Sequence, residues 1–545
     1  MTGHDTDEVI NQSPAYEDVD LFAADQPLRE ALAANGSAEP ASVLSAFGRH
    51  WGSAELMDQS RLANDNPPQL KTFDAKGRRL DVVEFHPAYH RFMAESMRAG
   101  LHSMTWRPDG TRAPVPAEVA RAARFYMVAQ IENGHMCPIT MTRAAVGALA
   151  SEPALVESLM PKICAHEYDA SFRPWWQKSA VTIGMGMTEK QGGTDVRTNT
   201  TRATRTADGY SITGHKWFMS APMSDAFLVL AQAQGGLSCF FMPRFRPDGR
   251  VNGLRFQRLK NKLGNKSNAS SEVEFVDAYA QRVGAEGAGI RTIIEMVQLT
   301  RLDCAVASAG IMRMGLAQAI HHARYRTVFQ KKLADQPMMR AVLADLALTM
   351  EGSIALVMRL CRALDHAGTD TAEAAYARLM TPVVKYWVCK KAPAFIYETM
   401  ECLGGNGYVE DSLLPRLYRE APVNAIWEGS GNVMCLDVLR ALSRDAEAAQ
   451  NVIAALGKAA ATLPGAQEVC SQIAKALAGA EGEAHARYAV EQLALLAAAA
   501  ALQAHAPSEI ADGFASSQFG RRGSNFGSAL SPIMTATVLQ RALPG

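Results

Sequence analysis

Chemistry could be supplied by a glycine-containing segment near the middle of the chain, Gly186-Met-Thr-Glu-Lys-Gln-Gly-Gly-Thr-Asp195. Its Gly-Gly pair lies between two threonines, so backbone N–H groups and hydroxyls could approach a flat or phosphorylated ligand closely. A turn that merely opens a strand would contain the same residues. From this segment alone, the plain turn is the better interpretation.

Two further segments could contact a ring system or a phosphate. Gly214-His-Lys-Trp-Phe-Met-Ser220 offers aromatic rings for stacking, although such rings more often pack in a core. Glu401-Cys-Leu-Gly-Gly-Asn-Gly-Tyr408 places three glycines after a long helical pattern, which is also an ordinary way to end a helix. Neither segment is specific by itself.

Glu428 is the candidate general base. It follows Trp427 in a turn, directly before the amphipathic run 433–442, and an apolar neighbour could raise the pKa of its carboxyl towards that of a working base. Ser430 or Asn432 could cap the following helix, whose amino end would attract an anion. A carboxylate at a helix start is more often only a partner of the helix dipole.

Other reaction centres find no support in the sequence. His86 and His90 have the spacing of metal ligands, but a capped helix start explains them better, and we expect no metal site. The chain has no serine-hydrolase elbow, Walker loop or zinc-protease motif.

The elements that must position these residues fall into four parts. Residues 1–180 are mainly helical in pattern, residues 181–290 alternate short strands and turns, residues 291–440 form long helical segments, and residues 441–545 form an alanine-rich helical end. The sequence therefore predicts a mainly α protein with a small antiparallel β domain and an extra C-terminal helical domain.

Several individual elements can also be placed. The strand patterns cover residues 210–213, 227–231, 238–242 and 271–275. Long helices are expected over 338–366 and over 382–403, the latter with Pro382 in its first turn and a kink at Pro393. The C-terminal pattern is helical to about residue 506 and weaker in the Gly/Ser-rich stretch that follows.

Composition excludes several classes of protein. The 545 residues carry 55 Lys+Arg against 55 Asp+Glu, which excludes a protein that is basic throughout but leaves room for a local basic patch. The longest apolar run, 493–502, is too short to cross a bilayer, so we expect no membrane association. An acidic amino end and nine scattered cysteines favour a reduced, cytoplasmic protein.

Taken together, the segments resemble the acyl-CoA dehydrogenase family of flavoproteins. Residues 186–195 match its first signature, with a departure nearby at Thr198, where the family prefers a smaller residue. The second signature keeps every spacing through Glu401, Gly404, Gly405, Gly407, Tyr408, Asp411, Arg416 and Glu420. Segments 61–68, 137–141, 259–268 and 427–432 are similar to the alkylation-response, or AidB-type, branch of that family. The resemblance implies the acyl-CoA dehydrogenase fold, with a small antiparallel β-barrel as its middle domain.

The resemblance also implies a bound FAD held by residues 291–440 and the β domain. The flavin ring and pyrophosphate would be lined by Met187, Thr188, Gly193 and Thr194. Phe218 takes the place of a ring-stacking tryptophan, and Ser220 that of a hydroxyl near flavin N5. The FAD of a neighbouring subunit would be reached by Arg326, Phe329, Gln336, Glu401, Gly404 and Gly405. Its adenine half would meet Ser430 and Asn432, and Trp427 would also contact the cofactor.

The same resemblance assigns the reaction and the assembly. Glu428 aligns with the base that removes the α-proton of a thioester while the β-hydride moves to flavin N5. Gln298 stands where other members carry the base on a helix, and an amide cannot serve. Shared FAD sites imply a homotetramer. Gln330 and Ala280-Gln281 depart from the family pattern and bear on the CoA-binding surface more than on the flavin site.

The C-terminal domain, residues 441–545, is the candidate DNA-binding part, because AidB-type resemblance implies sequence-independent binding of double-stranded DNA. Arg440, Arg521 and Arg522 are the predicted contacts, and after Asp512 the chain has three arginines, the third being Arg541, and no acid. A solvated end that packs on the helices is an equally good interpretation.

Three functions follow from these patterns. The first is an AidB-type flavoprotein that protects DNA against alkylation, with weak or unknown dehydrogenase activity. The alternative is a true acyl-CoA dehydrogenase that acts on a short branched acyl thioester and has no DNA role. A third is a scaffold whose flavin stabilises the assembly without turnover.

Overall fold

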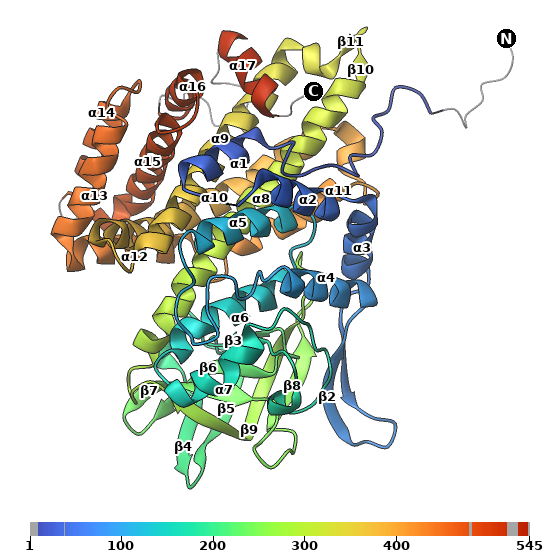
Figure 1. The fold of residues 1–545 in the computed structure, drawn as a ribbon, viewed down its shortest axis with the longest axis vertical. Coiled ribbons are helices and arrows are strands. Elements are labelled where there is room, and N and C mark those ends of the chain that lie inside the picture. The colour runs from blue at the N-terminus through green and yellow to red at the C-terminus, as the bar shows by residue number, and fades with distance from the viewer. Residues whose placement is uncertain (1–8, 38, 479–481, 520–531, 543–545) are drawn as a thin grey trace, which may run out of the picture. The chain divides into compact units, whose positions relative to one another are not determined.

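The computed structural model describes residues 9–37, 39–478, 482–519 and 532–542, and the chain divides into two compact units (Figure 1). The sheet unit comprises residues 58–121 and 132–303. The helical unit comprises residues 1–57, 122–131 and 304–545. Three of the four divisions fall inside helices, α3 (Ala54–Asp65), α5 (Ala117–Ala129) and α8 (Gly289–Tyr325), and the fourth follows α5 at residues 131–132.

A seven-stranded closed sheet forms the centre of the sheet unit. Its strands are β3 (Ile183–Gly186), β4 (Arg202–Thr206), β5 (Gly209–Ser220), β6 (Ala226–Ala233), β7 (Gly236–Pro243), β8 (Leu254–Leu259) and β9 (Ser270–Val283). β5, β4, β6, β7 and β9 pair in a ring, β3 joins both β5 and β6, and β8 lies beside β9. The pairings are antiparallel except β3–β6 and β4–β6, so the expected β-barrel domain is confirmed with two parallel contacts added.

The core explains why β6 has no polar alternation. Its Leu228 and Leu230 belong to a cluster with residues of α6 (Met136–Leu149) and α7 (Pro153–Ile163), whereas Phe227 and Val229 belong to the second cluster, within the sheet. A strand that is buried on both faces reads as a continuous apolar run. The other elements of this unit are the hairpin β1 (Gln69–Phe73) and β2 (Arg79–Glu84) and the helix α4 (Pro87–Arg98).

The helical unit is built on long helices. α9 (Pro337–His366) packs against α10 (Thr371–Cys402), and both contact α15 (Gly482–Gln503). The remaining helices are α1 (Gln26–Ala34), α2 (Ala41–Trp51), α11 (Leu413–Glu420), α12 (Gly431–Arg444), α13 (Ala446–Ala459), α14 (Ala466–Leu477), α16 (Ser508–Gln518) and α17 (Pro532–Ala542). A hairpin of β10 (Thr327–Val328) and β11 (Lys331–Lys332) follows α8. α9 alone among the described helices is long and apolar enough to span a membrane, and 89% of its apolar window is buried inside the protein.

Two sequence expectations need correction. The helix expected from Pro382 begins at Thr371, because the Asp370 side chain caps it by accepting from the backbone N–H groups of Ala372 and Glu373, so both prolines lie inside α10. Helical structure also continues past residue 506 as α16 and α17. Serines and a glycine weaken the pattern of α16, whose buried face combines Ile510 and Phe514 with the polar Ser517 and Gln518.

Candidate functional site

The segment 187–194 follows β3 directly, and its glycines are required by the backbone. Gly192 has φ +144, a conformation that residues with a side chain rarely adopt. A Cβ atom on Gly193 would lie 2.3 Å from Oγ1 of Thr188. The pair therefore folds the segment tightly back on Thr188, and Thr194 is exposed beyond it. At the departure from the family pattern, the Thr198 hydroxyl donates to the carbonyl of Asp195 at 2.8 Å.

Glu189 anchors this segment to the sheet. Its carboxylate is fully buried and accepts from the ammonium of Lys216 at 2.8 Å and from the backbone N–H groups of Thr200 and Thr201 at 2.7 and 3.1 Å. Burial alone would raise the pKa of Glu189, but Lys216 and the hydrogen bonds hold it well below its usual value. Glu189 is therefore a charged structural anchor.

The end of β5 presents aromatic rings beside this segment. Phe218 is 49% exposed, and the Lys260 ammonium lies 3.3 Å from the ring centroid of the neighbouring Trp217 and 4.5 Å from that of Phe218. The backbone N–H of Trp217 donates to the carbonyl of Thr188 at 2.8 Å. Ser220, half-buried, lies with its hydroxyl 3.2 Å from that of Ser270. The sheet unit thus brings together the six residues that we assigned there, Met187, Thr188, Gly193, Thr194, Phe218 and Ser220.

In the helical unit, a lysine from α10 fixes the turn that carries Glu428. The buried Lys385 ammonium donates to the carbonyls of Trp427 and Gly429, at 2.9 and 2.8 Å. Glu428 lies between these two carbonyls, half-buried, with φ +58. A non-glycine residue in this region costs free energy that the surrounding structure must offset. Lys385 thus supplies two contacts that support the strained turn.

The amino end of α12 follows this turn. Ser430 occupies the N-cap position but its side chain makes no capping bond, and Asn432 is exposed. The first N–H groups of a helix are orphan donors, so this end is suited to an anion. The Trp427 indole N–H donates to Oδ1 of Asn424 at 3.0 Å, which fixes the ring beside the turn.

Three of the predicted cofactor residues lie on or beside the β10–β11 hairpin. Arg326 donates to the carbonyl of Asn11 at 2.9 Å, and Gln336 donates to that of Val328 at 3.0 Å. Phe329 and Gln330 form the tip with φ +50 and +65, and the Phe329 side chain is 90% exposed. An exposed aromatic ring on a braced tip is suited to contact another molecule.

The glycines after α10 differ in their roles. A Cβ atom on Gly407 would lie 2.2 Å from the carbonyl oxygen of Met400, so this glycine is needed for packing. Gly404 has φ +61 and ends the helix, whereas Gly405 is exposed with open space around it. Glu401 is exposed on the last turn of α10. Gly404, Gly405 and Glu401 are therefore accessible to a ligand.

Sequence reasoning missed three side chains, Glu189, Lys216 and Lys385. Lys216 lies on the same side of β5 as the buried Ile212, and Lys385 interrupts the buried apolar stretch 383–388 of α10. A single lysine on an otherwise buried face was the available signal, since a buried charge requires a partner.

The predicted DNA contacts are only partly described. Arg440 is exposed on α12 and has no ion pair among the residues that the structure describes. Arg521 and Arg522 lie outside the described residues. Arg541, the third arginine of the acid-free end, is buried and paired with Glu351 and Glu30, so the expected cluster of three available arginines is wrong for this member.

Two of the remaining sequence interpretations concern histidines and metals. The His86 side chain accepts from the N–H of Ala88 and caps α4, as the capped-helix interpretation requires. Within the described ranges, no group of His, Cys, Asp and Glu side chains is arranged to hold a metal ion.

Comparisons with known proteins cover most of the chain. The adaptive response protein AidB N-terminal domain matches residues 11–170, the acyl-CoA dehydrogenase middle domain matches 184–278, and the acyl-CoA dehydrogenase C-terminal domain matches 287–443. The chain is 51% identical to AidB of Escherichia coli (strain K12) over 443 residues, which is 81% of each chain.

Solved structures have the same fold. Caenorhabditis elegans ACDH-11 in complex with C11-CoA superposes with a TM-score of 0.84 at 26% identity, over 99% of this chain and 93% of that one. The acyl-CoA dehydrogenase complexed with FAD from Bacillus anthracis superposes with a TM-score of 0.65 at 15% identity, over 95% and 86% of the two chains.

Proposed function

Because the chain belongs to the acyl-CoA dehydrogenase family, whose members are FAD-dependent oxidoreductases, and within it to the AidB type, we propose that it dehydrogenates an acyl-CoA thioester with Glu428 as the base. The observation that carries this proposal is the strained turn at Glu428, which Lys385 holds from both sides. Strain that the surrounding structure over-determines is concentrated at functional sites.

The residues present fit FAD. The tight turn at Gly192 and Gly193 lets a ligand approach the backbone, and the half-exposed Phe218 ring offers a stacking face. In the helical unit, the uncapped start of α12 with Ser430 suits a phosphate or an adenine edge. When bound, FAD accepts the hydride from the substrate.

The chain's own contribution is to hold the base and the substrate in position. The Glu428 carboxylate takes the proton from the carbon next to the thioester carbonyl and retains it on a carboxylate oxygen. Lys385 is a positioning residue, because it touches the backbone on both sides of Glu428 and keeps the carboxylate aimed. A general base of this kind contributes typically about 10²–10⁴-fold to the rate.

The test is anaerobic mixing of the FAD-loaded protein with a panel of straight and branched acyl-CoA thioesters, with flavin bleaching as the readout. We expect at least one thioester to reduce the flavin, and Glu428→Gln to slow that reduction by about 10²–10⁴-fold with an unchanged flavin content. Glu447→Gln, which removes an exposed carboxylate from α13, is the matched control and should react like the wild type.

Two outcomes would contradict the proposal. Equal reduction rates for the wild type and Glu428→Gln would exclude Glu428 as the base. If no thioester bleaches the flavin, the scaffold without turnover becomes the better description. A reaction limited to short branched thioesters, with no DNA binding, would favour the alternative of a metabolic dehydrogenase.

We also propose that the protein is a cytoplasmic homotetramer whose FAD sites are shared between subunits. The exposed Phe329 at the braced hairpin tip supports the shared site, and nine free cysteines support a reducing compartment. Light scattering should give the tetramer mass, and Phe329→Ala should lower flavin retention.

A second candidate function is DNA-associated protection against alkylation. It is supported by the 51% identity to AidB and by the exposed, unpaired guanidinium of Arg440 within the described residues. Gel-shift titrations with unrelated duplexes should give equal affinities that fall steeply with salt. Arg440→Ala should weaken binding to all of them, as should the double change at Arg521 and Arg522. Unchanged affinity in both variants would reject this surface.

A further inference from the structure

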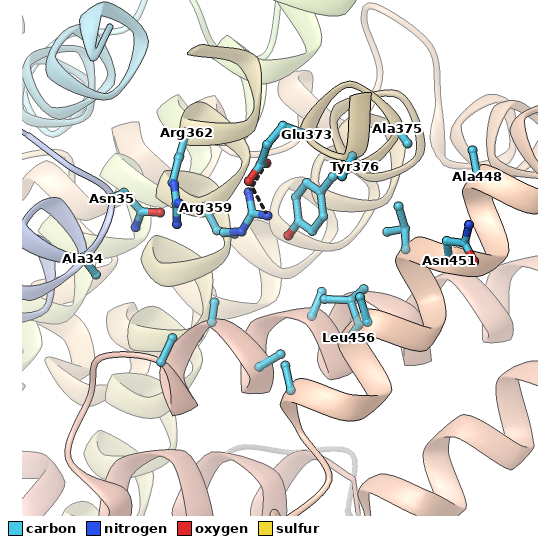
Figure 2. A pocket seen from close by; sticks show the side chains of 18 of the residues that line it. Ala34, Asn35, Arg359, Arg362, Glu373, Ala375, Tyr376, Ala448, Asn451 and Leu456 are labelled. Carbon is cyan, nitrogen blue, oxygen red and sulfur yellow. Dashed lines mark hydrogen bonds and ion pairs between the residues drawn. The ribbon is translucent and has the colours of Figure 1, made fainter. Parts of the chain in front are cut away.

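A large cavity lies inside the helical unit, between α9 and α10 on one side and α13 and α15 on the other (Figure 2). Its volume is about 580 Å³, within the range of pockets that hold small-molecule ligands. It shares no residue with the site described above. All of its lining residues belong to one unit, so its shape is set within that unit.

One side of the cavity is built from small apolar residues. α15 contributes Ala497, Ala500 and Ala501 to the buried floor, and α13 contributes Val452 and Leu456. Because alanine side chains are small, they leave open the space between α13 and α15 on one side and α9 and α10 on the other. This side can contact an apolar chain, and its one amide is that of the exposed Asn451 on α13.

The opposite side carries a buried hydroxyl without a partner. Tyr376 is 5% exposed and lines the cavity, and its hydroxyl finds no hydrogen-bond partner in the described part of the chain. Figure 2 shows the hydroxyl directed into the cavity. Burial raises the pKa of Tyr376 to about 12, so the group remains a donor at neutral pH. An unsatisfied buried donor costs free energy until an acceptor reaches it.

Two arginines accompany this hydroxyl. The Arg359 guanidinium lies 4.0 Å from the Tyr376 ring centroid and is held by the Glu373 carboxylate at 2.8 and 3.2 Å. Arg362, one helical turn further along α9, is exposed and has no carboxylate partner within the described ranges. The cavity therefore combines two guanidinium groups with a single carboxylate, which leaves its polar side cationic.

We propose that this cavity binds an amphipathic anion of the fatty-acid class, with its alkyl chain against the alanines of α13 and α15 and its carboxylate at Tyr376 and Arg362. The Tyr376 hydroxyl donates to one carboxylate oxygen, and the Arg362 guanidinium neutralises the charge. His505, just beyond the end of α15, has its pKa lowered by burial, so the positive charge of the cavity comes from the guanidinium groups. A divalent cation does not suit a site with this excess of guanidinium groups.

Calorimetric titration of the full-length, FAD-loaded protein tests the proposal with three probes of one chain length. Decanoate, below its micelle concentration, should bind at one site per chain. 1-Decanol should bind at least tenfold more weakly, because it lacks the charge, and decyltrimethylammonium should not bind. The flavin absorption spectrum should stay unchanged, since the cavity shares no residue with the flavin site.

Variants locate the bound probe. Ala500→Leu fills the buried floor and should weaken decanoate binding at least tenfold. Ala455→Leu fills the exposed rim of the same cavity, where a larger side chain is tolerated by the fold, and should weaken it similarly. Ala454→Leu, an exposed α13 position that does not line the cavity, is the matched control and should bind normally. Tyr376→Phe and Arg362→Gln should each weaken binding about threefold to tenfold.

Three results would overturn the proposal. Absence of decanoate binding would reject the site, including the case in which a neighbouring subunit fills the cavity. Unchanged affinity in the rim variant Ala455→Leu would place the ligand elsewhere, whether or not Ala500→Leu folds. Equal affinity for decanol and decanoate would remove the carboxylate from the assignment.

Discussion

The turn at 187–194 in the sheet unit and the turn at 427–429 in the helical unit are fixed by opposite means. In the sheet unit, the turn's own Glu189 reaches into the core and accepts hydrogen bonds from backbone N–H groups and from Lys216. In the helical unit, Lys385 reaches the turn from another helix and donates to its carbonyls.

This difference bears on our proposal that Glu428, and not Glu189, is the base. Both carboxylate oxygens of Glu189 already accept hydrogen bonds within the protein, and the side chain is fully buried, so Glu189 is not available to a substrate. Glu428 lies in a turn that a different residue, Lys385, anchors through the backbone, and Glu428 as a residue is only half-buried. A catalytic side chain is better placed when its backbone is held by neighbours than when it must anchor itself.

The largest expected effect comes from breaking the anchor of the sheet unit. Glu189→Gln leaves the buried Lys216 ammonium without its counter-charge, and loss of one partner of a buried pair typically costs about 3–5 kcal/mol. Urea unfolding should show this loss as a lower midpoint. The double change Glu189→Gln and Lys216→Met should recover most of it, because no unpaired charge remains. Additive losses in the double variant would contradict the pairing.

A buried histidine gives the sheet unit a second structural contribution, which can be measured through the pH dependence of stability. His102, in the sheet unit, is fully buried and donates from Nε2 to the carbonyl of Ala165 at 3.1 Å. Burial lowers its pKa from 6.5 to about 4. The stability that this neutral form contributes is complete above pH 6.5 and is lost as the pH falls towards 4, by about 3 kcal/mol.

His102→Gln should remove this share of the acid dependence, because an amide can donate the same bond and does not titrate. The measurement is the free energy of unfolding at pH 7 and at pH 4 for both proteins. His166→Gln is the control, because the His166 ring packs against the imidazole of His102 but His166 is exposed. An equal pH dependence in wild type and His102→Gln would show that His102 does not carry this effect.

Breaking the anchor of the helical unit should affect catalysis rather than cofactor binding. Lys385→Met removes both contacts to the turn, and the resulting misplacement of Glu428 should slow flavin reduction about 100-fold. The rate should fall more than the flavin content or the apparent affinity for the thioester, because Lys385 donates to backbone carbonyls of the turn and not to the side chains that we assign to the cofactor. Lys458→Met, an exposed lysine on α13, is the control. If Lys385→Met lost flavin to the same extent as it lost reduction rate, Lys385 would have a structural role and not the positioning role that we propose.

The fold was largely predictable from the sequence, and the reasons are local. The buried run 227–231 and the alternation at 271–275 each fall inside one strand, β6 and β9, because burial on two faces or one face leaves a direct pattern in the residues. The start of α10 was misplaced, since Pro382 is an acceptable first-turn residue and only the Asp370 cap reveals the true start.

The site was less predictable, because its supporting bonds join distant positions. The motif at 186–195 indicates a glycine turn, but nothing near it in sequence shows that Glu189 pairs with Lys216 across the sheet. Likewise, Lys385 and Glu428 are brought together only when α10 packs beside the turn. Arg541 read as an available cation and proved to be buried, since its partners Glu30 and Glu351 lie in α1 and α9.

The smallest expected effect concerns the backbone strain of residues with positive φ. It compares Glu428, whose side chain has a proposed function, with Gln330, whose side chain has none assigned. The sheet-unit turn places glycine at its positive φ, whereas the helical unit places Glu428 and Gln330 there, at +58 and +65. Gln330→Gly should stabilise the protein by about 1 kcal/mol, because glycine adopts this conformation without the penalty of a Cβ atom. Gln330→Ala keeps that penalty and should change little. Thermal unfolding of both variants measures the difference, and equal midpoints for Gln330→Gly and Gln330→Ala would show that a Cβ atom carries no penalty at this position.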